Sequence, residues 1–168
     1  YLTTPSRDNI PQGDPWNQHL VEETAALVVG AMRWFRETSM LDTSTLRSLP
    51  LDRLEFKYSM FSPFFEAVRQ AFLDEALLPR FGGGYVAAGQ AKLARTQELR
   101  ELFSPGHVAA LFDMEGAAWL SGDITEDKAP EIRKYLMREL EIEEVTPAKI
   151  VSRLSREFLE AQADEWIV

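Results

Sequence analysis

Histidine and cysteine, the side chains that most often supply catalytic bases, nucleophiles and metal ligands, are scarce: the chain has two histidines and no cysteine. His19 is followed by Glu22 and Glu23, whereas a helical zinc site needs two histidines four residues apart with a glutamate beside the first. His107 lies in the first turn of an expected helix, where the helix dipole disfavours an imidazolium. We therefore predict that neither histidine is catalytic and that the chain holds no metal site.

Other candidate catalytic side chains lack the contexts that their chemistry requires. No serine stands in a Gly-x-Ser-x-Gly motif, which would raise it onto a strand-to-helix turn. Nothing in the spacing of Glu141, Glu143 and Glu144 makes their oxygens converge, so a solvated acidic patch is expected there. Tryptophans can stack on sugars or bases, but three of the four lie in apolar stripes or an expected buried strand. We therefore predict core packing, and not a binding platform, for the set of four, which is Trp16, Trp34, Trp119 and Trp166.

Two segments remain as candidates for phosphate chemistry. Arg7 lies in an extended polar stretch with Ser6 and Asp8 on either side, from which a guanidinium can meet a phosphate bidentately. The triplet Gly82, Gly83 and Gly84 admits the positive φ angles of a tight turn, so we predict a hairpin turn there. A phosphate cradle is the alternative for the glycines, but no Lys-Ser/Thr pair follows them as in a P-loop.

Composition restricts the classes of protein that the chain can belong to. Its 168 residues fit one domain with one core, and 45% hydrophobic with 27% charged residues is an ordinary globular composition. A net charge of -9 disfavours binding to a phosphate backbone, so no nucleic-acid partner is expected. No apolar run approaches the length of a membrane span, and we expect no membrane partner. The absence of cysteine is consistent with a cytoplasmic location.

Cap and proline signals predict a mostly helical α+β domain with a small hairpin or sheet. Helices are expected over about 14–37, 62–77, 96–103, 104–112, 130–140 and 146–158, a hairpin over 77–87 and a buried strand over 117–121. The apolar residues expected to face the core from the first helix are Trp16, Leu20, Leu27, Val28, Ala31, Trp34 and Phe35. Residues 1–168 are thus expected to form one domain, with 1–13 as a linker or strand tail and 14–168 as the body.

The chain is expected to be a segment of a longer protein, because it lacks an initiator methionine and its last residues include no helix-closing residue. The segment Leu2-Thr3-Thr4-Pro5-Ser6-Arg7-Asp8 resembles the one by which the middle region of ninety-kilodalton heat-shock chaperone ATPases offers an arginine to bound ATP. With Trp16-Asn17 soon after, it is still more similar to sacsin-like proteins, large chains with a chaperone-type ATP-binding module. The Leu-Pro, Gly-Gly and aromatic-Val pattern over 77–87, with Ala91-Lys92-Leu93, resembles a second element of that family.

The resemblance implies a role for the chain beside an ATPase module. Arg7 would contact the terminal phosphate of ATP, with Ser6 and Asp8 holding its loop, while ATP and Mg²⁺ sit in the preceding module. The chain lacks the helix Asn or Glu, the Asp-x-Gly element and the glycine-rich lid of that family's nucleotide pocket. Alone it is therefore expected not to bind or hydrolyse ATP. The partners implied are the covalently linked ATPase module and client proteins; the alternative is an interaction or scaffold domain with no nucleotide role.

Overall fold

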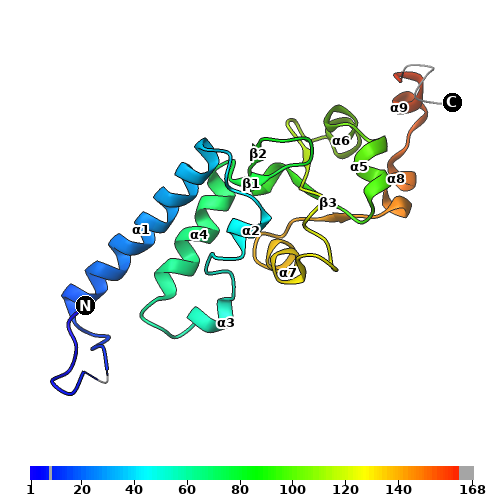
Figure 1. The fold of residues 1–168 in the computed structure, drawn as a ribbon. Coiled ribbons are helices and arrows are strands. Elements are labelled where there is room, and N and C mark those ends of the chain that lie inside the picture. The colour runs from blue at the N-terminus through cyan, green and yellow to red at the C-terminus, as the bar shows by residue number, and fades with distance from the viewer. Residues whose placement is uncertain (8, 163–168) are drawn as a thin grey trace.

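The N-terminal half of the chain is built around one long helix that packs on a second. The computed structural model describes residues 1–7 and 9–162. Helix α1 (Pro15–Glu37) begins where the Asp14 side chain accepts hydrogen bonds from two backbone N–H groups, with proline at the first helical position. Helix α4 (Ser62–Asp74) lies alongside it, and two short helices, α2 (Thr43–Leu46) and α3 (Arg53–Phe56), connect the pair (Figure 1).

Five short strands follow helix α4. The glycine turn joins β1 (Leu78–Pro79) and β2 (Tyr85–Val86) into the expected antiparallel hairpin. After the 3₁₀ turn η1 (Ala88–Gln90), strand β3 (Ala91–Ala94) lies between β4 (Ala118–Trp119) and β5 (Glu144–Val145), parallel to both. The register pairs Ala91 with Ala118 and Leu93 with Glu144.

The hairpin adjoins this parallel sheet. The Phe81 N–H donates to the Trp119 carbonyl over 2.8 Å, and the Ser121 N–H donates to the Pro79 carbonyl over 2.9 Å. An antiparallel bridge between Arg80 and Leu120 lies at the same junction. The hairpin therefore lies along the β4 edge of the three-stranded parallel sheet, and this isolated bridge with the two hydrogen bonds joins the two sheets.

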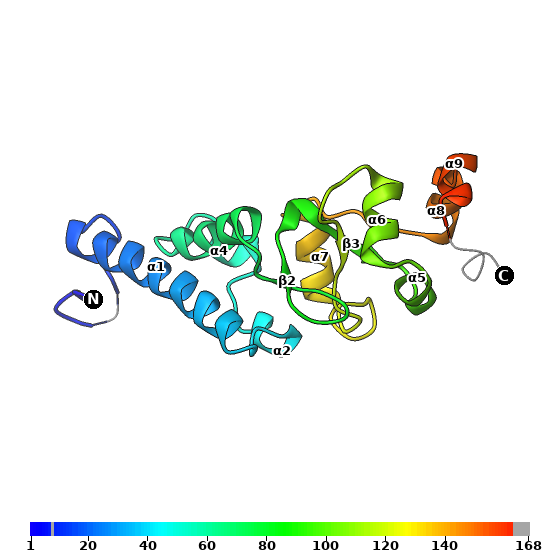
Figure 2. The ribbon, with the colours of Figure 1, turned by 90° about the horizontal axis from the view of Figure 1, so that it is seen from above.

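Helices cover both faces of the sheet. Helices α5 (Gln97–Leu102) and α6 (Pro105–Phe112) connect β3 to β4 on one face, and α7 (Pro130–Arg138) connects β4 to β5 on the other (Figure 2). Helices α8 (Pro147–Arg153) and α9 (Arg156–Glu160) complete the described chain. Alternate strand residues enter two cores: Leu93 and Leu120 pack with α1, α4 and α7, whereas Ala94 and Trp119 pack with α5, α6 and α8.

The α+β class predicted from the sequence is confirmed, since helices predominate and the strands are few and short. One expected helix is divided. The segment 146–158 ends its first helix at Arg153, Leu154 is extended, and the Ser155 hydroxyl accepts a hydrogen bond from Phe158 N at the start of α9. Val151, an apolar residue of α8, is exposed. A new N-cap serine in mid-segment is the physical reason for the break.

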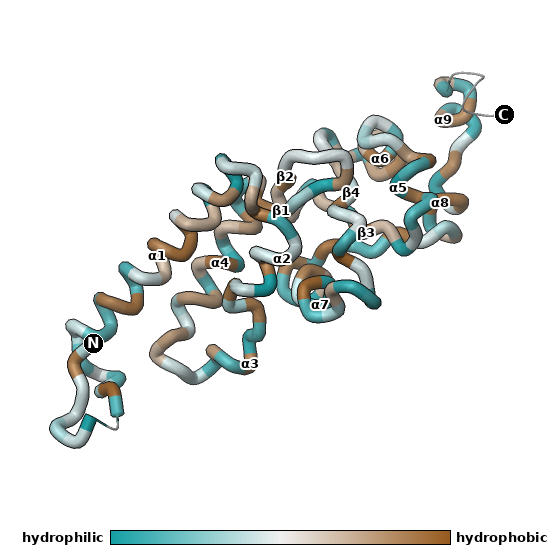
Figure 3. The backbone as a smooth tube through the Cα atoms, viewed as in Figure 1, coloured by the Kyte–Doolittle hydropathy of each residue, from teal (hydrophilic) through white to brown (hydrophobic). Residues whose placement is uncertain are grey.

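The core-facing side of α1 differs from the predicted one. The helix buries Asn17, Val21, Ala25, Val29 and Met32 against its neighbours. Trp16, Leu27 and Trp34, which were expected to face inward, are exposed, while Val28 and Phe35 are partly buried against the core. Apolar residues thus occur along the whole length of α1, on both its inner and its outer side (Figure 3). The prediction failed because this helix carries two apolar stripes, and periodicity alone does not say which one faces α4.

None of the helices within residues 1–7 and 9–162 combines the length and the apolar composition that crossing a bilayer requires.

Candidate functional site

The loop that carries Arg7 is a hydrogen-bonded turn. The Arg7 N–H donates to the Thr4 carbonyl over 2.9 Å, and the Thr4 N–H donates to the Asn9 carbonyl over 3.0 Å. Pro5 follows Thr4 in this turn, at the position where its fixed φ favours chain reversal. Arg7 has φ +60°, the left-handed region that few non-glycine residues adopt. The turn therefore closes in front of Arg7 and places this residue at the tip of the loop.

Asn17 fastens the loop to helix α1. Its side chain is completely buried and forms a two-way pair with Leu2: the Leu2 N–H donates to Oδ1 over 2.7 Å, and Nδ2 donates to the Leu2 carbonyl over 2.9 Å. Nδ2 also donates to the Pro11 carbonyl over 3.3 Å. One side chain thus holds both ends of the loop. Tyr1 adds an edge-to-face contact with Phe61 at 6.1 Å between ring centroids.

Arg7 itself is exposed at the tip. Within residues 1–7 and 9–162, no carboxylate lies in ion-pair distance of its guanidinium. Ser6 is also exposed, with its hydroxyl 3.2 Å from that of Thr4. Asp8, the other residue expected to support the loop, lies outside the described residues. Among the described residues, no carboxylate therefore competes with an incoming anion for this guanidinium.

The glycine triplet forms the β1–β2 turn, with φ +81°, +95° and +80° at Gly82, Gly83 and Gly84. The Gly83 N–H donates to the Arg80 carbonyl, and Arg80 Nε donates to the Gly83 carbonyl over 2.5 Å. The turn is thus closed by its own residues. It lies near the end of α1 that is remote from the Arg7 loop, so the structure does not bring the two segments together (Figure 1).

Of the three acidic residues before helix α8, Glu143 and Glu144 form ion pairs, contrary to the expected solvated patch, whereas Glu141 is exposed as expected. Glu143 immediately precedes β5, Glu144 is the first residue of that strand, and the two side chains pair with different basic residues. Glu143 pairs with Lys92 at 2.8 Å and with Lys149. Glu144 pairs with Arg133 at 2.6 Å and with Arg95 at 3.0 Å. The sequence did not show this because the basic partners come from β3, α7 and α8.

Lys92 is the most deeply placed of these cations. It lies on the central strand β3 with its Nζ 5.0 Å from the centroid of the Phe112 ring, and the Arg153 guanidinium lies 4.6 Å from the same ring. Burial, and then the charge of Arg153, lower the pKa of Lys92. The carboxylate of Glu143 pairs with both Lys92 and Lys149, and these two ion pairs fix the position of the Glu143 side chain.

The Glu144 pairs make stability depend on pH. Burial alone would raise the pKa of Glu144, but hydrogen bonds from Arg133 and Arg95 outweigh it and hold the pKa below the usual 4.5. A depressed folded-state pKa contributes stability that is present above the unfolded value and is lost as pH falls through the folded one. We expect Glu144→Gln to lower the unfolding free energy by about 1–2 kcal/mol at pH 7 and by much less below pH ~3.

Urea denaturation at both pH values measures this difference. The control is Glu126→Gln, because Glu126 is exposed and its carboxylate lies 3.9 Å from Arg95. An equal cost of Glu144→Gln at the two pH values would contradict the role given to its charge.

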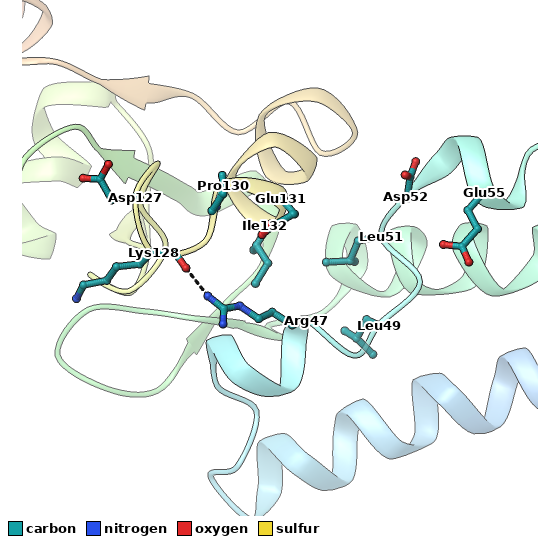
Figure 4. Close-up of a pocket in the computed structure, with 10 residues that line it drawn as sticks. All are labelled: Arg47, Leu49, Leu51, Asp52, Glu55, Asp127, Lys128, Pro130, Glu131 and Ile132. Carbon is teal, nitrogen blue, oxygen red and sulfur yellow. Dashed lines mark hydrogen bonds between the residues drawn. The ribbon is translucent and has the colours of Figure 1, made fainter.

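A broad hollow of about 610 Å³ lies between the α2–α3 segment and α7. Arg47 reaches across it and donates to the Lys128 carbonyl (Figure 4). Leu49, Leu51 and Ile132 form its apolar floor, with acidic residues on both rims. Its walls come from segments that are far apart in the sequence, which is why no motif marked it. No group of three or more histidine or acidic residues in the described part of the chain is placed to hold a metal ion.

Comparison of the chain with protein-family models, with curated proteins and with solved structures gives no significant match. The candidate site therefore stands on the geometry of the Arg7 loop. Of its parts, sequence reasoning identified Arg7 and Ser6 but gave no role to Asn17. One sequence pattern could have revealed it: Asn17, Val21 and Ala25 are spaced four residues apart and so share one face of α1. A polar residue on this buried face needs hydrogen-bond partners.

Proposed function

We propose that this chain is a non-catalytic accessory domain of a cytoplasmic, chaperone-type, sacsin-like ATPase. In this proposal Arg7 contacts the terminal phosphate of ATP, which is held with Mg²⁺ by a neighbouring module of the same protein. Movement of the Arg7 loop then couples the nucleotide state to the helical body and to client proteins. The observation that carries the proposal is an exposed arginine, without an ion-pair partner among the described residues, on a turn anchored at both ends by Asn17.

The chemistry asked of Arg7 is electrostatic. During phosphoryl transfer, charge develops on the terminal phosphate oxygens, and a guanidinium placed against them stabilises the transition state more than the ground state. Such help requires the cation to be positioned beforehand. The closed turn and the buried Asn17 anchor provide that positioning, whereas a side chain on an unanchored loop would first have to be ordered.

The test compares ATP turnover by the full-length protein with and without this arginine. We expect Arg7→Ala to lower kcat at least about tenfold while the Kd for ATP changes by less than about threefold, because the contact strengthens only in the transition state. Arg156→Ala is the matched control, since Arg156 is also exposed but lies on α9 at the other end of the chain. Wild-type turnover in Arg7→Ala would refute the proposal.

A second candidate function is an interaction or scaffold domain with no role in nucleotide chemistry. The observation in its favour is the exposed apolar side of α1, which contains Trp16, Leu27 and Trp34. A full-length protein that lacks an ATP-binding module would favour this second function. The two functions also differ in what Arg7→Ala does, because a scaffold would keep its partners when Arg7 is removed.

A further inference from the structure

The outer side of helix α1 is an apolar surface without a partner. Leu27 is 71% exposed, Trp16 55% and Trp34 53%, values unusual for three large apolar residues on one helix. Trp16 and Trp34 are equally distant from the buried Ala25, each by two and a half turns, so both lie on the side opposite to it. Together with Leu20, Glu23, Gly30 and Ala31 these residues form the outer stripe of α1.

Nothing in the described chain covers this stripe. Helix α4 packs on the inner side of α1, and its contacts with α1 far exceed those of any other element. The outer side faces away from α4 in both ribbon views (Figures 1 and 2). The stripe extends for about 27 Å between Trp16 and Trp34, at 1.5 Å per residue. An apolar stripe of this length on a surface helix, interrupted here by Glu23, is typical of a helix-binding face.

The charges beside the stripe indicate the chemistry of what binds there. Glu23 lies within the stripe; it is exposed and forms no ion pair with any described residue. The basic residues at the other end of α1 are different: Arg33 and Arg36 both pair with Glu75. The unpaired charge along the outer side is therefore negative, as is the net charge of -9.

We propose that the outer stripe of α1 binds a basic amphipathic helix of a partner protein or segment. The partner's apolar residues, repeating at helical spacing, pack on Leu20, Leu27 and the two tryptophans. A lysine or arginine in the middle of its apolar face meets Glu23. Gly30 and Ala31 are small, so the backbone of the partner helix can approach α1 closely beside Trp34.

A second copy of this chain fits the stripe poorly. Antiparallel pairing of two α1 helices about Ala25 sets Trp16 against Trp34 of the other copy, but it also brings the two Glu23 side chains near each other at the centre. Like charges at such a position destabilise the pair, and two chains of charge -9 repel at long range. Charge complementarity thus favours a basic partner over self-association.

The experiment titrates the 168-residue chain with a synthetic 21-residue peptide of leucine and lysine, with leucine at the heptad a and d positions except for one lysine at a central d position. Binding is measured by isothermal titration calorimetry and by tryptophan fluorescence. A peptide of the same composition in scrambled order is the control for nonspecific attraction to an acidic protein, and a third peptide carries glutamate in place of lysine. We expect the amphipathic basic peptide alone to bind the wild-type chain.

Variants locate the binding surface. Leu27→Asp should weaken binding more than about tenfold, because it puts a charge in the centre of the apolar contact. Leu54→Asp, a change of another exposed leucine on α3, should leave the affinity within about twofold of wild type. Glu23→Lys should weaken binding of the basic peptide about fivefold and allow the glutamate peptide to bind. Circular dichroism confirms that each variant is folded.

Three results would overturn the proposal: equal binding of the scrambled peptide, unchanged affinity in Leu27→Asp, or dimerisation of the wild-type chain that Leu27→Asp abolishes. The last result would assign the stripe to a second copy. The proposal does not depend on the role of Arg7, which none of these variants alters.

Discussion

Replacing Trp119 by alanine is expected to lower the unfolding free energy by about 3–5 kcal/mol. Trp119 is 2% exposed and is among the largest fully buried side chains of the described chain. It lies on β4, packs in the core formed by α5, α6 and α8, and its Nε1 donates to the Phe103 carbonyl over 2.7 Å. Alanine would leave a cavity between β4 and these helices and would remove the hydrogen bond to the Phe103 carbonyl.

The chain provides its own matched control for this prediction. Trp34→Ala removes the same side chain from the outer side of α1, where it is half exposed, and should cost less than about 1 kcal/mol. Thermal melting measures both, with an expected shift of roughly 2–4 °C per kcal/mol for a chain of this size. An equal loss for the two variants would mean that Trp34 is packed as deeply as Trp119, which contradicts the orientation of α1.

The second large effect concerns the anchor of the Arg7 loop. Asn17→Ala removes three side-chain hydrogen bonds that are shielded from water, two to Leu2 and one to Pro11. We expect the unfolding free energy to fall by about 2–3 kcal/mol and the Leu2 amide to lose its protection from hydrogen exchange. Urea denaturation and amide exchange followed by NMR measure the two quantities.

Graded variants show whether the loss comes from these bonds. Asn17→Asp still accepts from the Leu2 N–H but cannot donate to either carbonyl, so its cost should be at least as large at neutral pH. Gln18→Ala removes one exposed bond to the Gln12 carbonyl and should change stability by less than about 0.5 kcal/mol. Full protection of Leu2 in Asn17→Ala would contradict the anchor.

Elements with strong local signals were predicted well from the sequence. Ser62-Pro63, Ser104-Pro105 and Thr146-Pro147 each mark a helix start, and helices begin there in the structure, with side-chain caps at Ser104 and Thr146 but not at Ser62, which is the first residue of α4. At the second of these, the Ser104 side chain accepts from the His107 N–H while His107 Nδ1 accepts from the Ser104 N–H. Such caps act over three or four residues, so the sequence contains all the information that they need.

Elements that depend on distant partners were not predicted. Strand β3 is only four residues long, and all four are buried because helices cover both faces of the sheet. Its sequence Ala-Lys-Leu-Ala therefore shows no alternation that would reveal a strand. Strand β5 lies in what the sequence presents as an acidic connector, and its pairing with β3 depends on residues about fifty positions away.

In the candidate site, too, the features with local sequence signals were predicted and those that depend on distant contacts were not. Arg7 and the glycine turn are visible as short motifs, and the turn geometry follows from the glycines themselves. The anchoring role of Asn17 is not visible, because it depends on the chain folding back so that Leu2 meets the first turns of α1. The exposed stripe was recognised as apolar but assigned to the core, since only the packing of α4 decides which side of α1 is covered.

The pairing of Leu2 with Asn17 has a mechanical consequence. Asn17 lies in the first turn of α1 and is hydrogen-bonded directly to Leu2. A force applied at Leu2 therefore reaches the start of the helix through these bonds and not through the loop between the two residues. Helix α1 extends from this point to the neighbourhood of the sheet and packs mainly on α4 (Figure 1). We expect a small displacement of its first turn to tilt the whole helix relative to α4.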